Sequence, residues 1–218
     1  GQGKYEASET LINELIDGNP YSCAYWNQLT QIQFLRNDVQ GAITSSEYAL
    51  AINPNDEEAL LNKANGLFSL DNFVESLKYY QQYRQTCHHV DFSIIDVTIG
   101  HLYLILGHPK EALDFYFQSI TESENKDQAL INVAISIFDN GYFELTYRIL
   151  INYLPNSAKD WTEGFAYLAR CCYELKKTEE YKQFLQIAIE RNPRECQDVL
   201  SDLYPPGTDI KDYPSINI

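Results

Sequence analysis

Small residues and prolines recur along the chain at a spacing of about 34 residues. An Asn-Pro dipeptide stands at positions 19–20, 53–54 and 192–193, and each of the last two copies follows a short run that begins with alanine, at 49–52 and 188–191. Proline cannot continue the hydrogen bonding of a helix that precedes it, so each copy is expected to end one. A repeat of this length predicts a series of short helices with regular breaks.

Five segments share one pattern when they are aligned from residues 23, 57, 93, 127 and 162. In each segment, small residues tend to occupy positions 8, 20 and 27, and larger apolar residues surround them. Small side chains let two helices approach closely, while the larger ones fill the remaining space. Position 8 holds Thr30, Ala64, Gly100, Ala134 and Ala169. Each segment is therefore expected to form a helix pair, and one pair leaves an apolar face that the next pair must cover.

Glycine stands at position 15 of two of these segments, where the first helix of the pair should end. These residues are Gly107 and Gly141. Glycine adopts the left-handed backbone that a residue with a Cβ resists, and helices commonly end on such a residue. We therefore expect a tight turn at both positions.

This pattern resembles the tetratricopeptide repeat, whose unit carries Trp-x2-Leu-Gly-x2-Tyr, then Ala-x3-Phe, then Ala and Pro. In the first segment the matching residues are Trp26, Leu29, Ala42, Ala49 and Pro54. Thr30 and Gln33 replace the family's glycine and tyrosine, and Thr146 replaces the alanine at position 20 of the fourth segment. The resemblance covers residues 23–193. It implies an all-α fold, a right-handed superhelical solenoid of about five helix pairs with flanking helices.

The two ends lie outside the five repeats. Residues 1–22 read as the second half of a partial repeat, with a helix over 4–17 that either caps the array or is the edge of a longer one. Residues 194–203 are expected to form a capping helix. Residues 204–218 contain several prolines and no periodicity, which predicts an extended tail, either free or lying along the solenoid.

The charge of the chain limits the possible partners. Sixteen lysines and arginines stand against 31 acidic residues, a net charge of −15. Nucleic-acid binding depends on basic residues that neutralise phosphates, so we do not expect it. The acidity either maintains solubility or favours a basic partner. No apolar run approaches the roughly 20 residues that span a bilayer, so we expect no membrane insertion. A soluble, cytoplasmic protein is favoured, with export possible if a signal segment has been removed.

Chemically reactive residues do not form a recognisable site. The five cysteines, an odd number, match no zinc or disulfide spacing, so buried free thiols are expected. The stretch Cys87-His88-His89-Val90-Asp91 has no second cluster to complete a metal shell. No phosphate loop or nucleophile motif appears, and His101 is the only candidate base. We expect no catalysis, no metal and no cofactor.

The family resemblance implies that the first helix of each pair lines a groove that binds a peptide. The groove positions hold Asn27, Gln28, Gln31, Phe34, Asn62, Asn65, Phe68, Thr98, His101, Asn132, Phe138, Tyr167, Arg170 and Tyr173. At position 6 all five residues can form hydrogen bonds, and a side-chain amide can pair with an extended peptide's backbone. We expect Asn62 and Asn132 to face water, since burying an unsatisfied amide is costly. The apolar residues at position 12 either contact a ligand or pack between helices.

The resemblance implies a non-catalytic scaffold or adaptor that binds a protein or an extended peptide segment. The lysines with which some family members hold a C-terminal carboxylate are missing here, which favours an extended neutral segment. The alternative is a structural subunit that contacts a larger assembly through its convex face or its open ends. The oligomeric state stays open.

Overall fold

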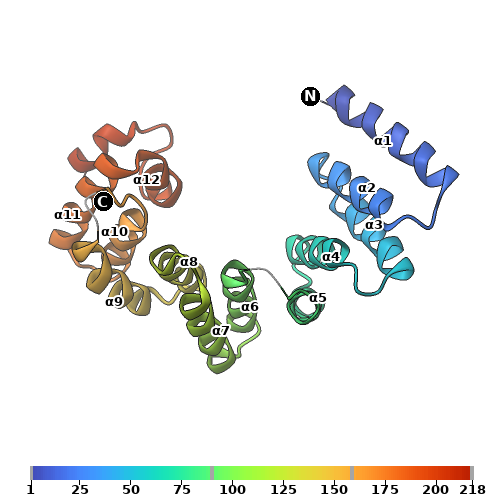
Figure 1. The fold of residues 1–218 in the computed structure, drawn as a ribbon. Helices are drawn as coiled ribbons and strands as arrows, with labels where there is room; N and C mark the ends of the chain where they lie inside the picture. The colour runs from blue at the N-terminus through green and yellow to red at the C-terminus, as the bar shows by residue number, and fades with distance from the viewer. Residues whose placement is uncertain (1, 89–90, 158–159, 217–218) are drawn as a thin grey trace. The chain divides into compact units, whose positions relative to one another are not determined.

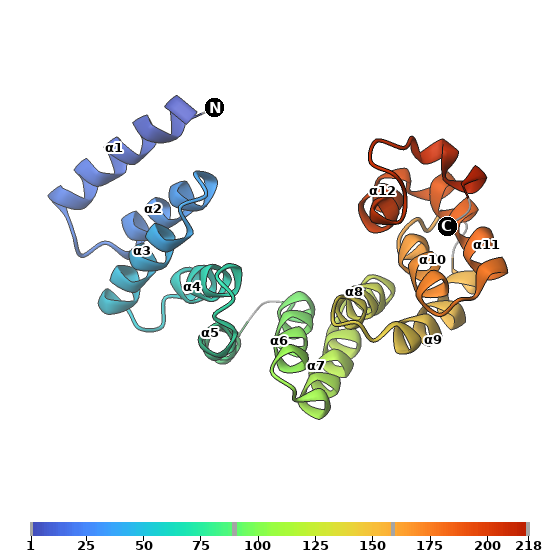
Figure 2. The same ribbon diagram turned by 180° about the vertical axis from the view of Figure 1, so that it is seen from behind.

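The computed structural model describes residues 2–88, 91–157 and 160–216. In this part of the chain the structure contains α-helices and short 3-10 helices but no strand, as the all-α prediction requires. The chain divides into two compact units, Gly1–Gln118 and Ser119–Ile218. The boundary falls inside helix α7, Pro109–Glu122 (Figures 1 and 2).

The first unit is built from consecutive helices that pack on their neighbours in sequence. They are α1 (Gln2–Gly18), α2 (Cys23–Leu35), α3 (Val39–Ile52), α4 (Glu57–Ser69), α5 (Phe73–Thr86), α6 (Ser93–Ile105) and most of α7. Ile12 and Ile16 of α1 are buried against Leu29 of α2. Short connections keep neighbouring helices in contact, so nearly all the packing in this unit is local in sequence.

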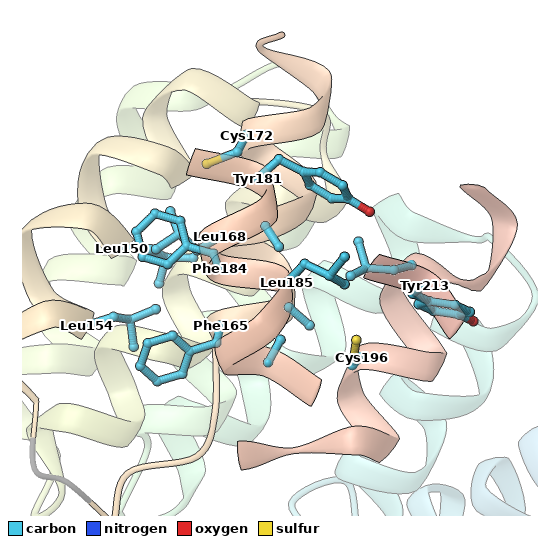
Figure 3. Packing of buried hydrophobic residues seen from close by; sticks show 14 of the residues in the cluster. Leu150, Leu154, Phe165, Leu168, Cys172, Tyr181, Phe184, Leu185, Cys196 and Tyr213 are labelled. Carbon is cyan, nitrogen blue, oxygen red and sulfur yellow. The ribbon is translucent and has the colours of Figure 1, made fainter. Parts of the chain in front are cut away.

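The second unit continues in the same way and contains the largest core. Its helices are α8 (Lys126–Asp139), α9 (Phe143–Tyr153), η1 (Leu154–Asn156), α10 (Phe165–Glu174), α11 (Thr178–Arg191), α12 (Pro193–Leu200), η2 (Ser201–Leu203) and η3 (Ile210–Ser215). Figure 3 shows side chains from α9, α10, α11 and α12 converging on this core, with Leu168 and Leu185 among the fully buried ones.

The first helix of every pair ends in the same turn. The residue at position 15 is left-handed in all five pairs: Asn37, Asp71, Gly107, Gly141 and Lys176. After α6, for example, Gly107 N–H donates to the Leu104 carbonyl and His108 N–H to the Tyr103 carbonyl. These two bonds form the Schellman motif, which satisfies carbonyls that the helix end leaves unpaired. The prediction for the two glycines is confirmed.

Small residues lie where the paired helices approach most closely, as predicted. Ala42, Ala64, Ala112, Ala134 and Ala169 are all 0% exposed. A Cβ added to Gly100 would lie 2.5 Å from the ring of Tyr116 in α7, so the position accepts only glycine without rearrangement.

The threonine that departs from the family pattern in the second unit also fits this packing. Thr146 takes the place of alanine at position 20 and is fully buried. Its hydroxyl is 3.5 Å from the carbonyl of Ala134 in the paired helix and donates to the Tyr142 carbonyl at 3.2 Å. In the first unit Ser76 does the same, donating to the Ala64 carbonyl at 2.9 Å. A hydroxyl is tolerated there because its donor is satisfied.

The C-terminal segment is not extended throughout, so that expectation was wrong. Residues Ile210–Ser215 form η3, and Tyr213 is 1% exposed. Its ring stacks on Tyr204 with centroids 3.8 Å apart, and the Tyr204 hydroxyl is hydrogen-bonded to that of Tyr181. Burying two aromatic rings offsets the cost of ordering a proline-containing segment.

All five cysteines are free thiols, and all but Cys23 are buried. Among the described residues, no three histidines, cysteines or carboxylates are placed to hold a metal ion. His89 and Val90 of the stretch noted above lie outside the described residues. No helix in the described ranges is long and apolar enough to cross a membrane.

Candidate functional site

The candidate residues of the first unit lie on the first helices of successive pairs, which contact one another. Asn27 of α2 donates a hydrogen bond of 2.8 Å from Nδ2 to Asp56 Oδ1. Asp56 is the N-cap of α4, and the same oxygen accepts from the backbone N–H of Ala59 at 3.0 Å. Asn27 is 3% exposed. One end of its amide therefore joins α2 to the start of α4.

Two buried amide atoms next to this junction have no hydrogen-bond partner among the described residues. They are Oδ1 of Asn27, an acceptor, and Nδ2 of Asn62 in α4, a donor. Asn62 is 7% exposed, so the expectation that it faces water was wrong. Both atoms are buried from solvent. A buried polar atom without a partner costs about 1–3 kcal/mol.

A polar pair at the surface joins the same two helices. Gln31 Nε2 donates to Glu58 Oε1 at 3.1 Å, and both side chains are exposed. Gln31 is one helical turn after Asn27, and Glu58 is one turn before Asn62, so each lies on the same face as its buried neighbour. Gln28 is also exposed. We call Asn27, Gln31, Glu58 and Asn62 the amide cluster.

The other candidates in the first unit contact residues of their own or of neighbouring helices. Asn65 accepts a hydrogen bond of 2.5 Å from the Tyr80 hydroxyl, and the Thr98 hydroxyl donates to the Ile94 carbonyl. Phe68 is half-buried, with its ring 5.7 Å from Phe73 and 6.0 Å from His101. Phe34 is half-buried as well. The packing interpretation of the position-12 stripe fits Phe68 better than a ligand contact does.

In the second unit, three of the candidates line a single pocket of about 440 Å³. Its lining residues are Phe138, Asp139, Gly141, Phe143, Tyr167, Arg170, Asp198, Val199 and Asp202, from α8, α9, α10, α12 and the segments that follow α8 and α12. The ring of Phe138 lies between two others, with centroids 5.3 Å from Phe143 and 5.1 Å from Tyr167. Both pairs are T-shaped, so the rings present a mixture of faces and edges.

Arg170 is committed to structural contacts. Its Nε donates to Glu174 at 2.8 Å, and its Nη1 donates to Asp202 at 2.5 Å and to the Val199 carbonyl at 3.3 Å. The guanidinium lowers the pKa of the Asp202 carboxyl. Arg170 thus ties α10 to α12 and η2. The sequence interpretation, which placed it in a groove, did not include these contacts.

Tyr167 lies in the field of several carboxylates. Burial raises its pKa to about 12, and the negative charges of Asp139, Glu195 and Asp198 act in the same direction. Its hydroxyl is therefore neutral at physiological pH. The carboxylates of α12 escaped the sequence interpretation because that helix lies beyond the last repeat.

The last two candidates lie outside this pocket. Asn132 accepts from Gln128 Nε2 at 3.2 Å, and the same nitrogen donates to Glu163 at 2.7 Å. Asn132 is half-buried, so it is only partly solvent-facing. Tyr173 has its ring 5.8 Å from that of Tyr181 and lines a separate hollow with Lys176 and Lys177.

Comparison with known proteins identifies the fold. No family model and no curated protein matches the sequence. Among solved structures, a tetratricopeptide repeat protein from Parabacteroides merdae has a TM-score of 0.70 at 18% identity, covering 87% of this chain and 74% of that one. PilW, a type IV pilus biogenesis factor, has a TM-score of 0.69 at 16% identity, covering 91% of this chain and 92% of its own.

A third structure is YrrB, a TPR protein with an unusual peptide-binding site. It has a TM-score of 0.57 at 13% identity, covering 88% of this chain and 98% of its own. At these identities the likeness shows the fold. The chain has the tetratricopeptide-repeat fold, as the repeat pattern predicted.

Proposed function

We propose that the chain is a non-catalytic scaffold that binds an extended segment of another polypeptide across the first helices of its pairs. The observation that carries this proposal is the pair of unpartnered amide atoms, Asn27 Oδ1 and Asn62 Nδ2. One accepts and the other donates, and they belong to neighbouring helices.

An extended peptide matches this pair chemically. Each of its backbone units offers one N–H donor and one C=O acceptor. Its N–H would donate to Asn27 Oδ1, and a C=O would accept from Asn62 Nδ2. For a peptide to reach these atoms, the Gln31–Glu58 hydrogen bond has to open. That bond joins two exposed side chains, so opening it costs little energy. Binding then removes an unsatisfied donor and acceptor that the free protein carries.

Two further points support a binding role. The fold is shared with YrrB, a protein that has a peptide-binding site. In addition, burial raises the pKa values of Cys171, Cys172 and Cys196 to about 12, which keeps these thiols protonated and poorly nucleophilic.

The test is peptide selection followed by substitution. A displayed library of random peptides is selected on the full chain, and the affinities of the recovered peptides are measured by fluorescence anisotropy. We expect Asn62→Ala to weaken binding by about 5- to 150-fold, because one hydrogen bond to a buried group is worth about 1–3 kcal/mol. Asn55→Ala, on the exposed turn before α4, is the matched control and should leave affinity unchanged.

Stability separates a binding role from a structural one. Removing an unsatisfied donor should leave the free energy of unfolding of Asn62→Ala within about 1 kcal/mol of the parent, since the lost packing and the relieved donor offset each other. A folded variant that binds the selected peptides as tightly as the parent would refute the role of the amide cluster. Recovery of no peptide at all would refute the proposed function.

A further inference from the structure

The pocket of the second unit combines aromatic rings with carboxylates, and we infer that it binds an arginine side chain of the partner polypeptide. This inference rests on the proposed function, because it assigns a chemistry to the bound segment. The residues that carry it, here called the aromatic-acidic pocket, are Phe138, Asp139, Phe143, Tyr167 and Asp198.

The charge of the lining favours a cation. Three carboxylates, Asp139, Asp198 and Asp202, stand against the single guanidinium of Arg170, a formal charge of −2 for the lining residues. Arg170 directs its donors to Asp202 and to Glu174, which lies outside the lining. The positive charge of Arg170 is therefore neutralised by carboxylates of the same unit. The chain as a whole has a net charge of −15, which also favours a basic partner over an acidic one.

Asp198 is placed to receive a ligand at the rim. Its side chain is 69% exposed, and its ion pair with Arg194 is long, at 4.0 Å, and lies on the surface of the same helix. Exposed pairs of this kind contribute little to stability, so an incoming cation can replace Arg194 at small cost.

The aromatic residues favour arginine over lysine. A cation over an aromatic ring is attracted by the negative face of the ring, and a planar guanidinium also stacks on it. Guanidinium binds a carboxylate through two parallel hydrogen bonds, which an ammonium group cannot do. Phe138, Phe143 and Tyr167 supply adjoining rings beside the carboxylates of α8 and α12. A volume of about 440 Å³ is at the lower end of ligand pockets and suits a side chain rather than a helix.

The test uses N-acetyl-arginine amide as the probe and the full chain labelled with 15N. N-acetyl-citrulline amide is the matched ligand control, because it has nearly the same shape without the charge. We expect arginine to shift the backbone resonances of Gly141, Tyr167 and Val199 with a millimolar Kd, N-acetyl-lysine amide to bind at least threefold more weakly, and citrulline to leave these resonances in place. Equal shifts with citrulline, or arginine-induced shifts elsewhere only, would overturn the inference.

Two variants on the protein side test the same point. Asp198→Lys places a cation at the rim and should weaken arginine binding by at least tenfold. The Asp198 side chain is exposed, so the substitution leaves the core packing in place. Glu179→Gln, with a side chain 90% exposed on α11, changes the charge outside the pocket and should have no effect beyond twofold. Unaltered arginine binding by Asp198→Lys would overturn the inference.

A failure of the arginine pocket can be distinguished from a failure of the proposed function. Selected peptides that lose affinity in Asn62→Ala but bind equally well with their arginines replaced by citrulline would sustain the proposed function and overturn the arginine pocket. Peptides whose affinity falls both with citrulline and with Asp198→Lys would support both.

Discussion

The turns that end the first helices each contain a left-handed residue. Replacing glycine at one turn, and introducing glycine at another, tests how much this backbone conformation contributes to stability. Gly141 has φ +79°, and a Cβ added there would meet no atom within 4 Å. The cost of Gly141→Ala is therefore one of backbone conformation alone. A residue with a Cβ in the left-handed region lowers the free energy of unfolding by about 1–2 kcal/mol. Replacing glycine also restricts the unfolded chain, which raises the free energy of unfolding by about 0.4–1 kcal/mol. The net effect is a destabilisation of about 1 kcal/mol.

The opposite substitution uses Lys176, which has φ +58° at the equivalent turn of the next pair. Its side chain is exposed, so little packing is lost when it is removed. Lys176→Gly relieves the left-handed strain of the folded state. It also makes the unfolded chain more flexible, which opposes part of this gain. The net effect is a stabilisation of about 0.5–1 kcal/mol. Both residues lie in the second unit, Ser119–Ile218, so both substitutions act on the same part of the chain.

The assay is thermal unfolding followed by circular dichroism at constant pH. The predicted changes correspond to shifts of about 2–4 °C in Tm for a chain of this size, down for Gly141→Ala and up for Lys176→Gly. Unchanged stability of Gly141→Ala, or a loss of stability in Lys176→Gly, would refute the reasoning, because sterics leave no other cause for a change of this sign.

Two further predictions concern buried charge and buried thiols. Asp96 is fully buried and receives hydrogen bonds from Arg84 at 2.5 and 3.2 Å, so Asp96→Ala should destabilise the chain by about 2–3 kcal/mol in urea unfolding. Asp17→Ala, at an exposed position of α1, should cost less. Cys171, Cys172 and Cys196 have pKa values raised to about 12, against roughly 8.5 when unfolded. The stability that these thiols contribute is complete below pH 8.5 and is lost as the pH rises toward 12. The free energy of unfolding, measured with reductant present, should therefore fall steadily above about pH 9. A constant value up to pH 10.5 would contradict this.

The sequence predicted those features that depend on neighbours close in the chain. Helix pairs, the turns at Gly107 and Gly141, and the small residues between helices all follow from spacing and backbone sterics. The same alignment places Asn37, Asp71 and Lys176 at position 15. Their left-handed backbone was missed because only glycine was taken as the signal. The common position, rather than the residue type, was the available evidence.

Features that depend on tertiary contact were predicted poorly. Asn62 was expected to face water, but the approach of α2 and α4 buries it. Arg170 was assigned to a groove and does line a pocket, but its hydrogen bonds to α12 and η2 were not foreseen. Tyr213 belongs to a segment without periodicity, and its burial depends on the ring of Tyr204. In each case the partner comes from another helix or from outside the repeats, so the spacing of the repeat carries no information about it.

The two proposed binding features differ in what they can discriminate. Amide groups that pair with backbone N–H and C=O groups accept almost any extended sequence, because every residue except proline offers the same pair of groups. The amide cluster therefore supplies affinity without selectivity. A side-chain pocket discriminates by charge and shape, and a carboxylate-rich lining disfavours acidic residues. With the proposed roles divided in this way, the first unit would hold the backbone of a polypeptide. The aromatic-acidic pocket of the second unit would then add a preference for arginine, in keeping with the net charge of −15.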